Sequence, residues 1–196
     1  MAELPVLDDL CLMSRNFALL VCCCLVATVP ACKKRETPAP PPRDVCALIT
    51  LEEIQTVQGS PMKESKSSAR GDAGLRVSQC FYTATEFSKS VNLALVQRDP
   101  DHPSGRSAKD FWKEKFDPYE NEEPQKDRDS EKEKGAPPKK IDGLGEEAYW
   151  ASNRFGGTLY VLKGDAFISV GLGGTDNEET KLEKSKALAQ KALQRL

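Results

Sequence analysis

The chain has 196 residues, with 28 Lys and Arg against 30 Asp and Glu and a formal net charge of −2. Because the first 32 residues hold one Arg and three acids, 27 charges of each sign remain after Cys32. This balance argues against a nucleic-acid-binding protein, which needs an excess of Lys and Arg to neutralise phosphates. Once a leader and a linker are set aside, about 150 residues remain, which fits a single domain.

A signal peptide is predicted over residues 1–32. Phe17 to Val29 contains 13 residues without a charge. That length is short for a membrane span but typical of the apolar region of a signal peptide. Residues 1–12 carry acids where a signal peptide is positively charged, whereas a start at Met13 leaves only Arg15 before the apolar run. We therefore expect the true start of translation to be Met13.

The end of this leader, VPAC at 29–32, resembles the lipobox of bacterial lipoproteins, in which a small residue precedes an acylated cysteine. Pro30 departs from the small residue usual at its position. The resemblance implies that Cys32 carries the lipid, so that the protein is exported and anchored on the periplasmic or extracellular face of a membrane. An ordinary secretory signal, cleaved near Ala31, is the alternative.

Two cysteines, Cys46 and Cys80, remain after Cys32. Because an exported chain enters an oxidising compartment, we predict that they form a disulfide. On the chain-entropy model, closing a loop of roughly 35 residues stabilises the fold by about 3–4 kcal/mol. Two separate buried thiols are the alternative.

The chain after Cys32 divides into a linker and a domain. Residues 33–43 are charged and then proline-rich, a composition that favours an extended polyproline II spacer. A ligand for an aromatic groove is the other interpretation of these prolines. One α+β domain is expected over 44–196. Within it, residues 117–140 hold 14 charged residues and four prolines, which predicts a disordered loop.

Three helices and six strands are expected in the domain. Thr50 and Glu53 form a capping box for a short helix that ends at Gly59. Helical spacing of apolar residues predicts two further helices, at 107–116 and 177–196. Apolar alternation and turn residues predict strands at 62–67, 77–85, 91–97, 148–152, 158–163 and 166–172. A tight hairpin turn at Gly164 and Asp165 joins the last two.

The order is therefore helix, three strands, helix, three strands, helix. It predicts an α+β fold in which helices pack on an antiparallel sheet of about six strands. In this arrangement the disulfide would attach the first helix to the second strand.

Several short motifs in this domain resemble those of a family of bacterial lipoproteins. They are CALIT at 46–50, the aromatic after Cys80, GLGEEAYW at 143–150, LYVLKGDAFISV at 159–170 and KALAQKAL at 186–193. The family is seen in actinobacteria and elsewhere, and it is similar in fold to the PsbP subunit of photosystem II. The resemblance covers roughly residues 44–196 without the charged loop. It implies a PsbP-like fold, but no activity, because the family has none known.

The residues that could carry catalysis or hold a metal have simpler explanations. His102 is the only histidine and lies in a proline-bounded loop without neighbours that could complete a triad or a zinc site. Glu146 and Glu147 are adjacent on a strand, so they point to opposite faces and cannot readily share one substrate. We therefore expect no enzyme, no cofactor and no metal.

The glycines at 171, 173 and 174 precede a helix, as in a phosphate-binding loop. The helix start carries acids that would repel phosphate, and no Lys follows the glycines in the required pattern. We therefore interpret them as turn residues, with Thr175 or Asp176 capping the helix.

Aromatic residues offer the best candidates for a binding surface. Tyr149 and Trp150 precede a loop that contains Arg154, and these three residues are predicted to contact a partner. Positions in the core are the simpler alternative for the two rings. The leading hypothesis is a membrane-anchored binding or assembly module for a protein or envelope partner, without catalysis. The alternative is a carrier of a small apolar or lipid ligand in a cavity between sheet and helices.

Overall fold

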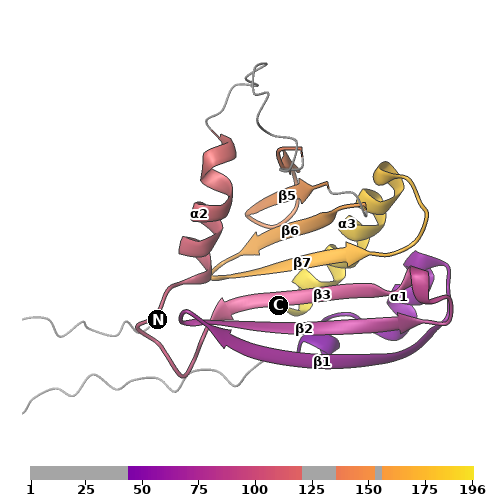
Figure 1. Cartoon of the computed structure of the whole chain (residues 1–196), viewed down its shortest axis with the longest axis horizontal. Coiled ribbons are helices and arrows are strands. Elements are labelled where there is room, and N and C mark those ends of the chain that lie inside the picture. The colour runs from indigo at the N-terminus through magenta and orange to yellow at the C-terminus, as the bar shows by residue number, and fades with distance from the viewer. Residues whose placement is uncertain (1–43, 121–135, 153–155) are drawn as a thin grey trace, which may run out of the picture. The chain divides into compact units, whose positions relative to one another are not determined.

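The computed structural model describes residues 44–120, 136–152 and 156–196 (Figure 1). In this part of the chain, seven antiparallel strands form one sheet, accompanied by three α-helices and two short 3₁₀ helices. The predicted fold class, an antiparallel sheet with packed helices, is confirmed. The sheet has seven strands where about six were predicted. The predicted signal peptide and linker, residues 1–43, lie outside the described residues.

The first half of the described domain consists of η1 (Val45–Leu48), α1 (Leu51–Gln58), β1 (Met62–Asp72), β2 (Leu75–Ala84), η2 (Phe87–Lys89) and β3 (Val91–Arg98). Helix α1 begins at the predicted capping box. Thr50 Oγ1 accepts from the Glu53 N–H at 3.2 Å, and Glu53 Oε2 accepts from the Thr50 N–H at 3.0 Å. Gly59 ends the helix with a φ of +65°, a conformation that glycine adopts without strain.

The second half consists of α2 (Ala108–Glu120), β4 (Lys139–Lys140), β5 (Glu147–Ala151), β6 (Thr158–Lys163), β7 (Ala166–Leu172) and α3 (Glu178–Arg195). Strands β6 and β7 are joined by the predicted tight turn, with Gly164 in a left-handed conformation. Helix α3 is capped by Asn177, whose side chain accepts from the Thr180 N–H at 2.8 Å. The predicted caps, Thr175 and Asp176, are therefore wrong by one or two residues.

The strands lie in the order β1-β2-β3-β7-β6-β5-β4. The two halves of the chain meet where β3 pairs with β7, for example at Leu93 opposite Val170. Figure 1 shows this junction in the middle of the sheet, with β1 at one edge. The strands of both halves therefore form one continuous sheet.

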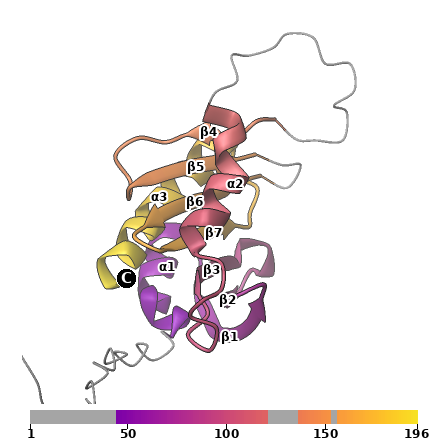
Figure 2. The ribbon, with the colours of Figure 1, turned by 90° about the vertical axis from the view of Figure 1, so that its left-hand side faces the viewer.

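Helices α1 and α3, with η1, cover one face of the sheet, which we call the inner face. Alternate residues of β3 and β7 point to it, because successive side chains of a strand point to opposite faces. Leu93, Leu95, Ile168 and Val170 are fully buried there, against Leu188 of α3. Figure 2 shows α1 and α3 on one side of the sheet and α2 on the other.

Helix α2 covers only part of the opposite, outer face. Its Trp112 and Phe116 are buried against Tyr149 and Phe167, and the Phe116 and Tyr149 rings stack at 4.5 Å. This cluster also includes Leu75 at the start of β2, Val96 near the end of β3 and Phe167 at the start of β7. The other end of the outer face, where β2 ends and β3 begins, is not covered by α2.

The largest differences from the predicted elements are at the sheet edges. The strand predicted at 62–67 continues to Asp72, because Ala73 and Gly74, with φ of +48° and +84°, form a tight hairpin turn into β2. The predicted loop at 117–140 is shorter at both ends. Its first residues complete α2 and Lys139–Lys140 form β4, while 121–135 lie outside the described residues.

Candidate functional site

An open hollow of about 380 Å³ lies where β2 ends and β3 begins. Its lining comes from the end of β2, from η2, from the starts of β3 and β6, and from the end of β7. The lining residues are Phe81, Phe87, Ser88, Ser90, Asn92, Gly157, Thr158, Gly171, Leu172 and Gly173. We call it the Phe81–Phe87 hollow, and it is the best candidate for a binding site among the described residues.

Two exposed aromatic rings form one wall of the hollow. Phe81 is 39 % exposed and Phe87 is 70 % exposed, and their ring centroids lie 6.1 Å apart. Phe81 points to the outer face because its neighbours on β2, Cys80 and Tyr82, point to the inner face. Apolar rings in water favour any contact that buries them, so this wall can supply binding free energy.

The loop that carries Phe87 is held in place by three side-chain hydrogen bonds. The Ser90 hydroxyl donates to the Phe87 carbonyl at 2.7 Å and accepts from the Ala84 N–H at 3.2 Å. The buried Gln58 amide donates to the Lys89 carbonyl at 2.8 Å. These bonds tie η2 to β2 and to the end of α1, so the exposed ring is presented by a fixed backbone.

Three glycines, Gly157, Gly171 and Gly173, leave part of the hollow without side chains. A Cβ on Gly173 would clash with the Ser88 carbonyl, and a Cβ on Gly157 would clash with the Trp150 ring. Glycine is therefore required at both positions by close approach. At Gly171 a Cβ would meet only Thr158 Oγ1 at 3.8 Å, so this position of β7 leaves room for a ligand to approach the backbone.

The charges nearest to the hollow neutralise each other. Lys89 Nζ lies 2.9 Å from Glu86 Oε2, and the Ser88 hydroxyl donates to Glu86 Oε1 at 3.1 Å. The hydrogen bond from Lys89 is the main reason why the pKa of Glu86 is lowered, and Glu86 in turn raises the pKa of Lys89. Because the lining residues themselves are uncharged, the hollow suits a neutral group.

The predicted disulfide between Cys46 and Cys80 is confirmed, with Cα atoms 5.2 Å apart. It links η1 to β2, and a buried tyrosine adds to this link. The Tyr82 hydroxyl donates to the Cys46 carbonyl at 3.3 Å and to the Ile49 carbonyl at 3.2 Å. Burial is the main cause of the raised pKa of Tyr82. These contacts lie on the inner face and hold the fold together.

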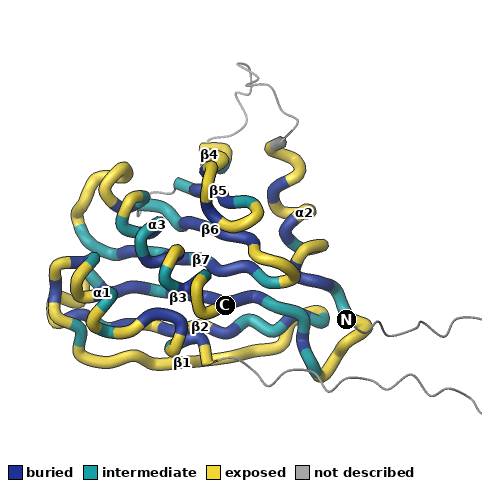
Figure 3. Tube along the Cα trace, turned by 180° about the vertical axis from the view of Figure 1, so that it is seen from behind, coloured by how far each residue is buried: buried dark blue, intermediate teal, exposed yellow. Residues whose placement is uncertain are grey.

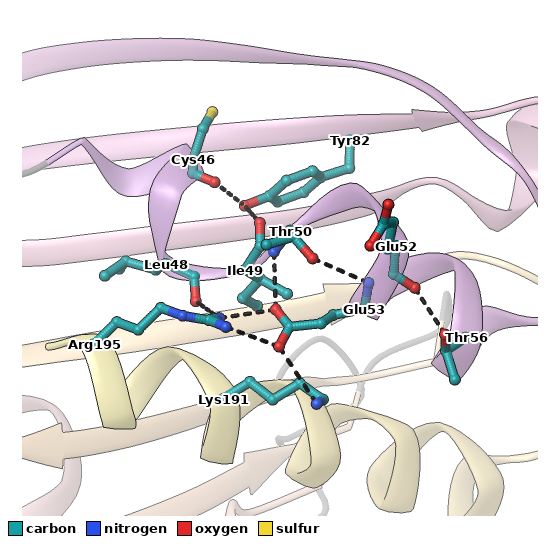
Figure 4. Close-up of polar contacts among 10 residues, drawn as sticks. All are labelled: Cys46, Leu48, Ile49, Thr50, Glu52, Glu53, Thr56, Tyr82, Lys191 and Arg195. Carbon is teal, nitrogen blue, oxygen red and sulfur yellow. Dashed lines mark hydrogen bonds and ion pairs between the residues drawn. The ribbon is translucent and has the colours of Figure 1, made fainter.

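A carboxylate on the inner side, Glu53, binds the end of α3 (Figure 4). Both of its oxygens accept from the Arg195 guanidinium at 2.8 Å, and Lys191 Nζ lies 3.4 Å away. Arg195 also donates to the Leu48 carbonyl at 2.9 Å. The hydrogen bonds from Arg195 are the main cause that lowers the pKa of Glu53 to about 2. Because these partners and the helix cap occupy the carboxylate, we interpret Glu53 as structural.

The two aromatic residues predicted to contact a partner are both buried, at 2 % exposure each. Tyr149 lies on the outer face beneath Phe116, whereas Trp150 donates from Nε1 to Glu178 Oε1 at 2.7 Å. Their burial agrees with the alternative given for both rings, positions in the core. Trp150 instead packs behind Gly157, one of the residues that line the hollow.

The polar residues weighed as catalytic candidates lie apart and have separate partners. His102 Nδ1 is 3.2 Å from Asp99 Oδ2 in a loop. Glu146 accepts from a backbone N–H of the β6–β7 turn at 2.7 Å, while Glu147 accepts from Trp112 Nε1 at 2.8 Å. The two glutamates therefore do not form one carboxylate pair.

The residues that define the hollow were not predicted as a site. Phe81 is the aromatic after Cys80, and its outward direction follows from strand alternation once Cys80 is known to point inward. Phe87 lies in a short connection between two predicted strands. Such connections run over the surface, so a large apolar residue there could have been recognised as exposed. The remaining predicted site residues, Cys32 and Arg154, lie outside the described residues.

Within 44–120, 136–152 and 156–196, no helix is long and apolar enough to cross a membrane. The same residues contain no group of three or more His, Cys, Asp or Glu side chains that could hold a metal ion. Comparison of the chain with protein families, curated proteins and solved structures finds no match. The assignment of the hollow as a candidate site therefore depends on its own geometry.

Proposed function

We propose that this protein is a lipid-anchored, exported binding module, without catalysis, that meets a protein or envelope partner at the Phe81–Phe87 hollow. The observation that carries the proposal is the pair of exposed phenylalanines on a part of the sheet that α2 leaves open. Aromatic side chains are enriched among the residues that dominate binding energy at interfaces.

The proposed address comes from the sequence. The leader, the VPAC segment ending at Cys32 and the proline-rich residues 33–43 together resemble a lipoprotein anchor and spacer. The Cys46–Cys80 disulfide supports export, because disulfides persist mainly in oxidising compartments. The proposed membership of a lipoprotein family with a PsbP-like fold depends on the short motifs described above.

The geometry of the hollow favours a neutral, partly apolar group of the partner. The rings of Phe81 and Phe87 supply apolar area, while Asn92 and Thr158 place polar side chains in the lining. Since Glu86 and Lys89 pair with each other, neither offers an unpaired charge for recognition. This combination of an apolar wall and a few polar groups is typical of binding sites.

A carrier of an apolar ligand fits less well. Such a protein needs a cavity between the sheet and its helices, and that space is filled by side chains. Ile54 of α1, Leu188 of α3 and Ile168 of β7 are each 0 % exposed there. A ligand would have to displace a close-packed core.

The docking proposal can be tested with a photo-crosslinking phenylalanine analogue placed at position 87 of the full chain in the producing bacterium. We expect a discrete adduct that disappears when Phe81→Ser is added. The same analogue at Tyr119, which is 43 % exposed on α2, is the matched control and should give none. No adduct at position 87, or equal adducts at both positions, would contradict docking at the hollow.

The anchor is tested separately, by mass spectrometry of the chain extracted from membranes. We expect a chain that begins at an acylated Cys32, and we expect Cys32→Ala to release the protein from the membrane fraction. An unacylated chain that starts at another residue would overturn the anchor without affecting the docking result.

A further inference from the structure

The two edges of the sheet differ in length and in exposure. Strand β4 at one edge has two residues, whereas β1 at the other edge has eleven. Among the described residues β1 pairs only with β2, and every side chain from Lys63 to Asp72 is exposed. Figure 3 shows this exposure along the length of the strand. A long edge strand with unpaired backbone groups is able to add a further strand.

We propose that β1 pairs with β1 of a second copy, antiparallel and about a two-fold axis that places Ser67 opposite Ser67. A two-fold antiparallel pair brings one residue opposite itself and pairs the residues on either side of it symmetrically. Ser67 is the middle residue of Met62–Asp72, so this register overlaps the whole strand. It places Glu64 of each copy opposite Arg70 of the other, once at each end of the paired segment.

The charges on β1 select this register over its neighbours. Centring the pair on Lys66 would place that lysine opposite itself. Centring it on Ser68 would place Lys66 opposite Arg70 and Glu64 opposite Asp72. Like charges directly opposite each other destabilise a strand pair, whereas opposite charges stabilise it.

Registers centred two residues from Ser67 retain opposite charges but shorten the overlap. Centring on Ser65 pairs only residues 62–68, and centring on Ala69 pairs only residues 66–72. Each of these registers therefore overlaps fewer residues than the register centred on Ser67. The register centred on Ser67 is the one that combines full overlap with opposite charges.

Two features of β1 fit this pairing. A bulge between Met62 and Glu64 interrupts the regular strand just before Glu64. Strand β1 pairs regularly with β2 from Glu64 to Asp72, so both members of each Glu64–Arg70 pair lie in regular strand. On the inner face, Ser65, Ser67 and Ala69 at the centre of β1 are small, so the middle of the pair holds no bulky side chain there. The two-fold axis is perpendicular to the sheet, so the Phe81–Phe87 hollows of both copies face the same side.

Cysteine cross-linking between purified full-length variants tests the register. In the proposed pair, Lys66 of one copy lies opposite Ser68 of the other, within the Cα separation that a disulfide spans. We expect an equal mixture of Lys66→Cys and Ser68→Cys chains to form at least five times more disulfide-linked dimer under mild oxidation than either variant alone. The unmodified chain gives the background from its other cysteines.

Charge reversal supplies the second arm, read in the same cross-linking mixture. Adding Glu64→Arg or Arg70→Glu to both chains should lower the cross-linked fraction by about fivefold, and adding both should restore it. Cross-linking of Lys66→Cys alone at the level of the mixture would overturn the register. Absence of dimer above background would overturn self-pairing. The disulfide between Cys46 and Cys80 should remain intact in every variant, which shows that the added cysteines have not exchanged with it, and an unchanged urea midpoint shows that the fold is retained.

Discussion

The two faces of the sheet differ in how their side chains are used. On the inner face the disulfide and the Tyr82 hydrogen bonds fasten η1 and the residue after it to β2, and the Glu53–Arg195 contacts join α1 to α3. On the outer face α2 covers one end, and at the other end the Phe81 and Phe87 rings remain exposed. Under the proposed function, stability and recognition are therefore separated between the two faces, so substitutions on them should have different effects.

The largest effect is expected from removal of the disulfide. The combined change Cys46→Ala and Cys80→Ala frees a loop with a sequence separation of 34 residues. We expect the free energy of unfolding to fall by about 3–4 kcal/mol, measured by urea denaturation without reductant. Reduction of the unmodified protein should produce the same loss, and reductant should not affect the double variant. Equal stability with and without the bridge would contradict this role.

The second effect concerns Glu53 and depends on pH. Because its pKa is lowered from 4.5 to about 2 in the folded protein, its contribution is present above pH 4.5 and is lost as the pH falls towards 2. Glu53→Gln should lower the free energy of unfolding at pH 7 by about 1–2 kcal/mol. This is less than the full pKa shift would give, because solvent screens the partly exposed carboxylate.

The difference between the Glu53→Gln variant and the unmodified protein should vanish near pH 2. Other carboxylates with lowered pKa values, such as Asp176 and Glu178, remain in both proteins. They therefore cancel in the comparison of two urea titrations across pH 2–7. A difference that is independent of pH would show that Glu53 acts through packing and not through its charge.

A smaller loss is expected from Tyr82→Phe. The change keeps the buried ring but leaves the carbonyls of Cys46 and Ile49 without this donor. We expect a loss of about 1 kcal/mol in the free energy of unfolding. Fluorescence of the buried Trp112 and Trp150 reports the transition. An unchanged midpoint would mean that other donors replace the hydroxyl.

The smallest effect on stability is expected from Phe87→Ser on the outer face. Its ring is 70 % exposed, so the free energy of unfolding should change by less than about 0.5 kcal/mol. The proposed partner adduct, probed with the photo-crosslinking analogue in place of Phe81, should nevertheless be lost in this variant. A loss of stability above about 1 kcal/mol would show that Phe87 stabilises the fold. It would contradict the idea that stabilising and partner-binding residues lie on different faces.

The elements with strong local signals could be predicted from the sequence. The Thr50 and Glu53 capping box places α1, apolar periodicity places α3, and the turn at Gly164 places the β6–β7 hairpin. The full length of β1 could not be predicted in the same way. Its residues are exposed on both faces and show no apolar alternation, so the strand is specified by its pairing with β2.

The site could be predicted only in part, because both faces of β5 are covered. The sequence left Tyr149 and Trp150 either as partner contacts or as core residues; in the structure α2 buries Tyr149, and Trp150 belongs to the inner-face core. The pattern of residues along β5 does not show that α2 covers its outer face, because that contact forms only in the tertiary structure. Likewise, the meeting of Phe81 and Phe87 with Gly171 and Gly173 depends on the β3–β7 pairing, which joins segments about 80 residues apart in sequence.

The Glu53–Arg195 contact also has a consequence for the timing of folding. The two residues are 142 positions apart, so α1 cannot reach this partner until residue 195 has been synthesised. Contacts of such separation close late and slow the approach to the native state. The Cys46–Cys80 disulfide and the Tyr82 hydrogen bonds join segments much closer in sequence, so we expect the docking of α3 against α1 to be the last step of folding. Until α3 docks, the inner faces of β6 and β7 that it covers remain exposed to water.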